Sequence, residues 1–307
     1  MANAIIQSSR AGLGLQAGAL HKAFGLGMGS HPDYVSKMWK IMSHDEAVYR
    51  MQGYAGLGLL SDIGENESIP MGSMGATATK LLTFTRYAGG FRLSRQFIDD
   101  LQYPEVLSNM MQELGRVSQI TRNVLATAPF NAPTGTTDVG FDSVAMLSAS
   151  HVRGKDNATW SNLLTGDLSE AVLESAIASV AVARDESGNL YPLNVKQLMV
   201  HPDNRAEAFR ILGSDKRYDT PNNDANYIKD EGILSVANTI VNPYLTDSDA
   251  FFLFTDAVDK GMWIDREGVR LAADKEDFMS ESIAHKAVFR STLGWNTAYW
   301  VYGSVGG

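Results

Sequence analysis

The sequence predicts an α+β protein, and three patterns carry that prediction. Between Pro104 and about Ala126, apolar residues recur at the three-to-four spacing of a long amphipathic helix. Between Ile63 and Asp100, a tip rich in Gly, Met, Ser and Thr precedes the alternating apolar and polar residues of a strand. After about Lys260, the pattern predicts one strand after another.

The composition is that of an ordinary globular chain. It has 307 residues, 44% of them hydrophobic and 20% charged, which is enough for a sizeable core or two domains. A net charge of −9 argues against a protein that grips nucleic-acid backbones, because such binding needs clustered Lys and Arg. There is no cysteine, which excludes disulfides, thiolate metal sites and cysteine nucleophiles.

Neither a membrane span nor a secretory signal is visible. No apolar run approaches the ~20 residues that cross a bilayer. Met1 to Arg10 lacks the basic and apolar regions of a signal peptide. We therefore expect a soluble intracellular protein with no membrane partner.

The N-terminal part predicts an arm. The first thirty residues contain six glycines, a composition that suits an extended segment better than a packed domain. From Tyr34 to Val48, the spacing of the apolar residues permits a helix.

A long β-hairpin is predicted next. Its outgoing leg is Val48 to Ile63, and the tip, from Gly64 to Ala78, consists of turn residues with Met71 and Met74 as its main apolar content. On the return strand, Gly89-Gly90 predicts a bulge or bend. Isolated two-stranded ribbons are marginal in water, so two interpretations stay open. The hairpin either folds onto its own sheet or reaches a partner.

The rest of the chain predicts an α/β unit followed by strands. A turn-rich connection runs from Pro129 to Thr165, and a helix with Asp167 as its N-cap runs from Leu168 to about Arg184. Asp203 is expected to cap a short helix that ends near Gly213. A polar loop follows, from Ser214 to Gly232. The predicted strands are Lys196 to Val200, Ile233 to Val241, Ala250 to Thr255, Val269 to Ala273, Ile283 to Arg290 and Thr297 to Tyr302.

No catalytic or metal-binding constellation is visible. Gly12-Leu13-Gly14 with Gly18 is similar to a dinucleotide loop, but the third glycine is one place too late and no strand precedes it. The six histidines show no metal-ligand spacing. Adjacent acids such as Asp99 and Asp100 are more typical of a solvated loop than of acid/base catalysis. We expect an interaction protein without a cofactor, and not an enzyme.

Taken in order, these parts resemble a tailed-bacteriophage major capsid protein of the Hong Kong 97 type, from roughly Pro32 to Tyr302. Four stretches also resemble capsid sequences of this superfamily in detail. They are Tyr87-Ala88-Gly89-Gly90-Phe91-Arg92-Leu93-Ser94-Arg95-Gln96-Phe97-Ile98-Asp99-Asp100, Leu147-Ser148-Ala149-Ser150-His151, Gln197-Leu198-Met199-Val200-His201-Pro202 and Ile240-Val241-Asn242-Pro243-Tyr244-Leu245.

The resemblance implies a domain organisation. It implies an N-terminal arm at 1–35, a P-domain with a long spine helix at 36–165, an E-loop hairpin inserted at about 48–95, an α/β A-domain at 166–262 and return strands of the P-domain at 263–307.

It also implies a shell-forming subunit. Such subunits assemble into pentamers and hexamers, and each E-loop lies across the adjacent subunit. The shell would be a virion capsid assembled in the host bacterial cytoplasm, enclosing double-stranded DNA without sequence-specific binding. The resemblance implies a portal as a further partner and leaves open whether a cement protein is also bound.

The resemblance also implies two sets of residues that contact neighbouring subunits. The expected intersubunit contacts of the E-loop are Glu65, Glu67, Met71, Met74, Phe84, Arg86, Arg92 and Arg95. The expected loop at the capsomer axis contains Lys216, Arg217, Tyr218, Asn222 and Asp224.

The sequence departs from some relatives at two points. The arm-and-helix region begins within about 45 residues of Met1, so we expect a separate scaffolding protein. Residues 63–78 contain no lysine, so we expect noncovalent clamping and no crosslinked chainmail. Two alternatives remain open: an encapsulin-type nanocompartment shell, or an enzyme that uses acidic loop residues around Asp224 and Asp230.

Overall fold

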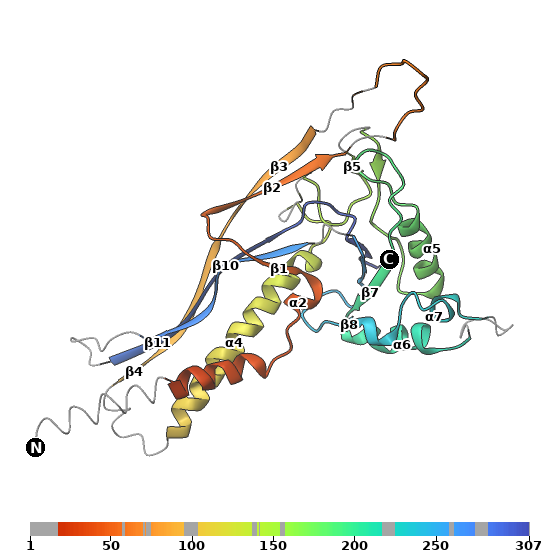
Figure 1. Ribbon diagram of the computed structural model, residues 1–307. Coiled ribbons are helices and arrows are strands. Elements are labelled where there is room, and N and C mark those ends of the chain that lie inside the picture. The colour runs from red at the N-terminus through yellow and green to blue at the C-terminus, as the bar shows by residue number, and fades with distance from the viewer. Residues whose placement is uncertain are drawn as a thin grey trace, which may run out of the picture.

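The computed structural model describes residues 18–56, 59–69, 71, 75–94, 104–136, 140, 142–153, 157–216, 225–257, 261–273 and 282–306. The chain forms an elongated body in which a sheet and a long helix lie side by side (Figure 1). A second sheet with short helices forms a more compact part, and a hairpin projects from the end of the elongated body.

The first sheet has the order β1-β10-β11-β4. Its strands are β1 (Lys40–Ser43), β10 (Met262–Ala273), β11 (Ser282–Gly294) and β4 (Thr85–Ser94). β1 is parallel to β10, and the other neighbours are antiparallel. The expected strands Val269 to Ala273 and Ile283 to Arg290 are confirmed as parts of β10 and β11 at the centre of this sheet, and β4 lies at its edge.

The long helix α4 (Pro104–Asn131) runs along one face of this sheet. Arg122 donates to Asp265 of β10 at 3.0 Å, and both side chains are largely buried. Burial raises the pKa of Asp265, although the charge of Arg122 opposes that rise. The expected end near Ala126 is wrong, because the helix continues through Pro129, whose missing N–H costs the ladder only one hydrogen bond.

The second sheet has the order β12-β9-β7-β8. Its members are β12 (Val301–Ser304), β9 (Phe251–Thr255), β7 (Val195–Val200) and β8 (Thr239–Val241). The last strand therefore pairs with β9 and not with the return strands β10 and β11.

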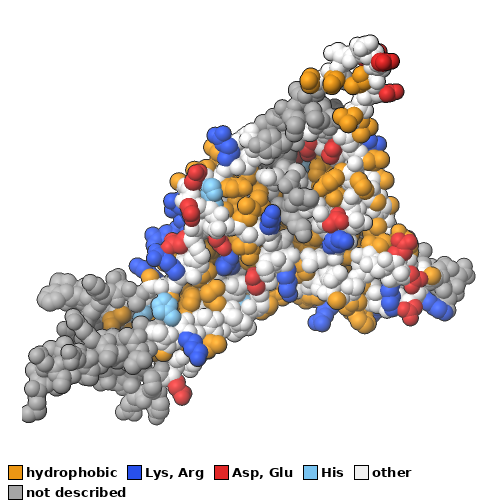
Figure 2. Space-filling view, viewed as in Figure 1, with side chains coloured by type: hydrophobic (Ala, Val, Ile, Leu, Met, Phe, Trp, Pro, Cys, Tyr) orange, Lys and Arg blue, Asp and Glu red, His pale blue; other side chains and the backbone are white. Residues whose placement is uncertain are grey.

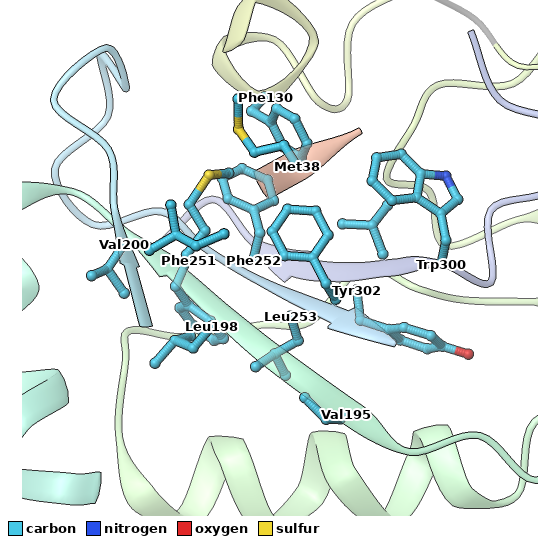
Figure 3. Close-up of a cluster of buried hydrophobic side chains, with 14 of the residues drawn as sticks. Met38, Phe130, Val195, Leu198, Val200, Phe251, Phe252, Leu253, Trp300 and Tyr302 are labelled. Carbon is cyan, nitrogen blue, oxygen red and sulfur yellow. The ribbon is translucent and has the colours of Figure 1, made fainter. Parts of the chain in front are cut away.

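The main core lies between this sheet and its helices. Every residue of β9 is buried, as its unbroken apolar run predicts. Side chains of β7, β9 and β12 meet Phe130 of α4 and Trp300 (Figure 3). The helices are α5 (Glu170–Ala181), η1 (Pro202–Asn204), α6 (Arg205–Gly213), α7 (Tyr227–Asp230) and η2 (Val236–Asn238).

Two helix caps differ from expectation. Ser169, and not Asp167, caps α5, because its side chain accepts a hydrogen bond from the N–H of Val172 at 3.4 Å. His201 caps η1 by accepting from the N–H of Asp203, so Asp203 is a first-turn residue there. The expected strand at Ile233–Val241 is limited to β8, because η2 occupies its middle.

The connection after α4 is anchored by a buried histidine. It contains a two-stranded ribbon of β5 (His151–Val152) and β6 (Thr159–Trp160). His151 contacts the carboxylate of Asp142 at 2.8 Å and Oδ1 of Asn162 at 3.0 Å. The Asn162 amide donates to the carbonyl oxygens of Met146 and Val301, which ties this connection to β12.

The N-terminal expectations are corrected in two places. Residues 18–29 are helical, and the expected extended arm can apply only to residues 1–17, which lie outside the described part. The helix permitted between Tyr34 and Val48 is limited to α2 (Val35–Met38). β1 follows it because parallel pairing with β10 overrides the local pattern.

Glycine explains how the helix at residues 18–29 packs on α4. A Cβ at Gly27 would lie 2.0 Å from the carbonyl oxygen of Gln112, and one at Gly115 would lie 2.2 Å from that of Phe24. Two backbones can approach this closely only where the side chain is a hydrogen atom. Gly27, one of the glycines that suggested an extended arm, therefore permits close helix packing.

We expect Gly27→Ala to destabilise the subunit by about 1–3 kcal/mol, because the added methyl group overpacks the contact with α4. Gly25→Ala is the matched control, since a Cβ at that position has open space around it. The control is expected to be neutral or to stabilise by up to about 1 kcal/mol. Urea unfolding of both variants measures the difference, and equal effects would contradict the packing.

Candidate assembly surfaces

The projecting hairpin consists of β2 (Val48–Ala55) and β3 (Gly75–Thr83). They pair in antiparallel fashion, with one irregularity between Gln52 and Tyr54. The expected return strand is thus divided, because β3 pairs with β2 whereas β4 pairs with β11. The expected bulge at Gly89-Gly90 is absent, since the β4–β11 register is continuous there.

The base of the hairpin packs on the first sheet of its own chain. Met51, Leu82 and Phe84 form a buried cluster with Met262 and Ile264 of β10. Phe84 is only 7% exposed within its own chain, so little of its side chain is accessible, and its expected contact with a neighbouring subunit stays a prediction. The base therefore folds onto its own sheet, as the first interpretation has it, whereas the tip extends away from that sheet and its contact with a partner stays a prediction (Figure 1).

The tip of the hairpin is apolar and uncovered. Four large apolar side chains there are between 65% and 95% exposed: Leu59, Leu60, Ile69 and Met71. Figure 2 shows hydrophobic and acidic side chains together at this end of the molecule. Clustered exposed apolar side chains at one site are typical of an interaction surface.

The tip is also acidic and locally ordered. Residues 59–69 include Asp62, Glu65 and Glu67 and no basic residue. The carboxylate of Glu67 accepts from the N–H of Gly64 at 3.1 Å, so Glu67 closes the turn, while Glu65 is exposed. The expected contact residue Met74 lies outside the described residues.

The face of β4 that points away from α4 is basic. Tyr87 stacks on Phe289 and shares a hollow with α4, so the alternate residues Arg86 and Arg92 point to the other side. Both are exposed, and Arg86 lies directly opposite Arg290 of β11. Like charges in such a pair repel each other, which favours an anionic partner on this face.

Three further basic residues on this face were missed from the sequence: Arg270, Lys286 and Arg290. They come from β10 and β11, and only the strand register brings them beside Arg86 and Arg92. Arg270 is paired with Glu267. The expected contact residue Arg95 lies outside the described residues.

An apolar groove of about 530 Å³ separates the far end of β4 from α4. Phe91 lines it from the sheet, and Val106, Met110, Leu114 and Val117 line it from the helix. Val106 and Val117 are 39% and 45% exposed. The sequence pattern assigned these residues to a buried helix face, so the groove was also missed.

The expected loop at the capsomer axis is described only at its ends. Lys216 forms a bridge with Ala225, and Lys229 donates to Asp215 and to the carbonyl oxygen of Gly213. Arg217, Tyr218, Asn222 and Asp224 lie outside the described residues. The role of this loop stays a prediction.

The described part of the chain shows neither a metal-ligand cluster nor a membrane-spanning helix. Within it, no three His, Asp or Glu side chains converge as metal ligands. None of the helices that the structure describes is long and apolar enough to cross a bilayer.

The projecting hairpin, the long helix beside a sheet, and the second α/β sheet together define a capsid fold of the Hong Kong 97 type. The model of the phage capsid protein family matches residues 77–306. The chain therefore belongs to the phage capsid protein family, and its resemblance to tailed-phage major capsid proteins is confirmed. No curated protein sequence matches it significantly.

Solved shell proteins share the fold. The asymmetric unit of the bacteriophage PhiM1 mature capsid matches with a TM-score of 0.59 and 9% identity, over 89% of this chain and 87% of the other. A virus-like particle from Pyrococcus furiosus matches with a TM-score of 0.56 and 9% identity, over 93% of this chain and 98% of the other. The SrpI encapsulin from Synechococcus elongatus PCC 7942 matches with a TM-score of 0.53 and 7% identity, over 89% of this chain and 87% of the encapsulin chain.

We expect Phe84→Ala to destabilise the isolated subunit by about 3–5 kcal/mol, because it empties the cluster that anchors the hairpin. Met71→Ala is the matched control at the exposed tip and is expected to change stability by less than about 0.5 kcal/mol. Chemical denaturation of unassembled subunits tests this difference. A small effect of Phe84→Ala would mean that the hairpin base is not held by its own sheet.

Proposed function

We propose that this protein is the major capsid subunit of a tailed bacteriophage, which assembles through pentamers and hexamers into an icosahedral shell around double-stranded DNA. The hairpin of each subunit lies on its neighbour and is held by noncovalent contacts. The observation that carries this proposal is the exposed acidic and apolar tip, which extends far from the body of its own chain.

The charge distribution supports contact between copies. The tip of one subunit carries Glu65 and Glu67, and the open sheet face of another carries Arg86 and Arg92. Each exposed ion pair contributes only about 0–1 kcal/mol. Cohesion must therefore come from burial of apolar surface repeated over many contacts.

The same proposal includes three partners, which are scaffolding, portal and cement proteins. It also includes the host cytoplasm as the place of assembly. The acidic chain suits a container that must release its DNA, because weak attraction to phosphates leaves the packaged duplex free. We propose no catalytic role.

An encapsulin-type compartment is the second candidate, because an encapsulin shares the fold. The contents of purified shells discriminate between the two. Double-stranded DNA inside them supports the phage capsid, whereas a copurifying cargo enzyme in place of DNA supports the compartment.

Deletion of Glu67 to Ala78 is expected to leave a folded subunit and to abolish closed shells, because the buried hairpin base is retained while half of the tip, with Ile69 and Met71, is lost. Circular dichroism checks the fold, and electron microscopy checks the shells. Normal shells from the deletion variant would disprove the role of the tip. Parent protein that stays monomeric under all salt and scaffold conditions would disprove the shell itself.

A further inference from the structure

A hollow of about 660 Å³ lies where α2 and β1 meet the second sheet. Its buried floor contains Trp39, Phe254 and Trp300, and the ring of Trp300 stacks on that of Phe254 with 5.7 Å between the ring centres. The surfaces proposed for contact between copies do not include this hollow. It differs from the rest of this acidic chain, because most of the charged residues that line it are basic.

Three lysines from three separate elements line the hollow: Lys37 of α2, Lys40 of β1 and Lys196 of β7. All three are exposed. Within the described part of the chain, no ion pair joins any of them to a carboxylate. The ammonium group of Lys37 lies 5.4 Å from the ring centre of Tyr34, and this cation–π contact helps to orient it. The hollow therefore gathers three ammonium groups without a direct counter-ion.

Asp256 is the only carboxylate among the described residues that line the hollow. Its oxygens accept hydrogen bonds from the backbone N–H and the side-chain amide of Asn194, at 2.8 and 3.0 Å. Burial raises the pKa of Asp256, but the hydrogen bonds from Asn194 and the charge of Lys196 outweigh burial and hold this pKa below its usual value. Three ammonium groups against one carboxylate leave the hollow positive in a chain whose net charge is −9.

Hydrogen-bond donors without a partner also line the hollow. The side-chain amides of Gln197 and Asn238 make no hydrogen bond within the part of the chain that the structure describes. On the floor, Nε1 of Trp300 is buried and has no partner, and Figure 3 shows that it points away from the hydrophobic cluster. A buried donor without an acceptor costs about 1–3 kcal/mol. A ligand that supplies acceptor oxygens here would therefore be stabilised by hydrogen bonds as well as by charge.

The types of residue indicate the class of anion. Among the described lining residues, the cations are all lysines and none is an arginine. Arginine suits planar carboxylates, because its fork forms two parallel hydrogen bonds with them, whereas an ammonium group acts as a point charge that binds phosphate oxygens from any direction. Ammonium groups from three elements around one hollow suit a chain of phosphates better than a single planar group.

We propose that this hollow is a binding site for a small oligophosphate, a class that includes the triphosphate chain of a nucleotide. Lys37, Lys40 and Lys196 bind the phosphate oxygens, and the amides of Gln197 and Asn238 donate further hydrogen bonds. The site uses none of the residues of the proposed contacts between copies. Binding therefore needs no assembled shell.

Isothermal titration calorimetry of unassembled subunits with inorganic tripolyphosphate tests this site. We expect saturable binding that the double variant Lys40→Ala with Lys196→Ala weakens at least about 10-fold, which corresponds to about 1.4 kcal/mol. The matched control is Lys22→Ala with Lys216→Ala, which removes the same charge from exposed lysines outside the hollow. The control is expected to keep the affinity of the parent protein, and circular dichroism checks that both variants are folded.

Three results would overturn the proposal. Parent protein without saturable binding would show that the hollow is not a site for oligophosphates. An equal loss of affinity in the two double variants would show that overall charge, and not the hollow, attracts the ligand. Citrate that binds as tightly as tripolyphosphate would show that the site does not select phosphates.

A short DNA duplex, added as a competitor, distinguishes the two sources of phosphate. We expect it not to displace tripolyphosphate, because a rigid duplex cannot enter a hollow of this size. Displacement by the duplex would assign the phosphates to packaged DNA and would overturn the small-molecule class. All of these measurements use unassembled subunits, so their failure leaves the proposed shell function standing. A parent protein that forms no particles would in turn leave this site standing.

Discussion

The arrangement of this subunit depends on one apolar contact, the burial of the hairpin base against β10. Two-stranded ribbons alone are marginal in water. Met51, Leu82 and Phe84 solve that problem by packing on Met262 and Ile264, which fixes the direction in which the hairpin leaves the body. With the base held, the tip needs no contact with its own chain. Its apolar side chains are exposed in the single subunit.

The same contact divides into two parts the face of the first sheet that points away from α4. The hairpin base covers the upper part, where β10 supplies apolar residues. The lower part carries the exposed Arg86 and Arg92, and Arg86 lies directly opposite Arg290. The acidic residues of the tip and the basic residues of the sheet therefore lie far apart within one chain. They can meet only between chains, which is the physical basis of the proposed assembly.

Local patterns in the sequence predicted the long helix and the late strands well, because both have a clear apolar period. These local patterns failed where contacts between distant parts of the chain determine the structure. β1 forms because β10 offers a parallel partner, and the helix at 18–29 packs on α4 where Gly27 and Gly115 allow close approach. The sequence pattern placed Phe84 on an uncovered strand, because no residue near it in the sequence indicates that β10 packs on it. Lys286 and Arg290 join Arg86 only through a register that spans about two hundred residues.

Hydrogen exchange measured by mass spectrometry on free subunits and on assembled shells tests the central claim most directly, since it reports protection of residues 59–69 and 85–94 without any substitution. If neighbouring copies cover the tip and the edge of β4, both segments exchange rapidly in free subunits and become protected in shells. Exchange at the tip that is equally fast in both states would contradict the account.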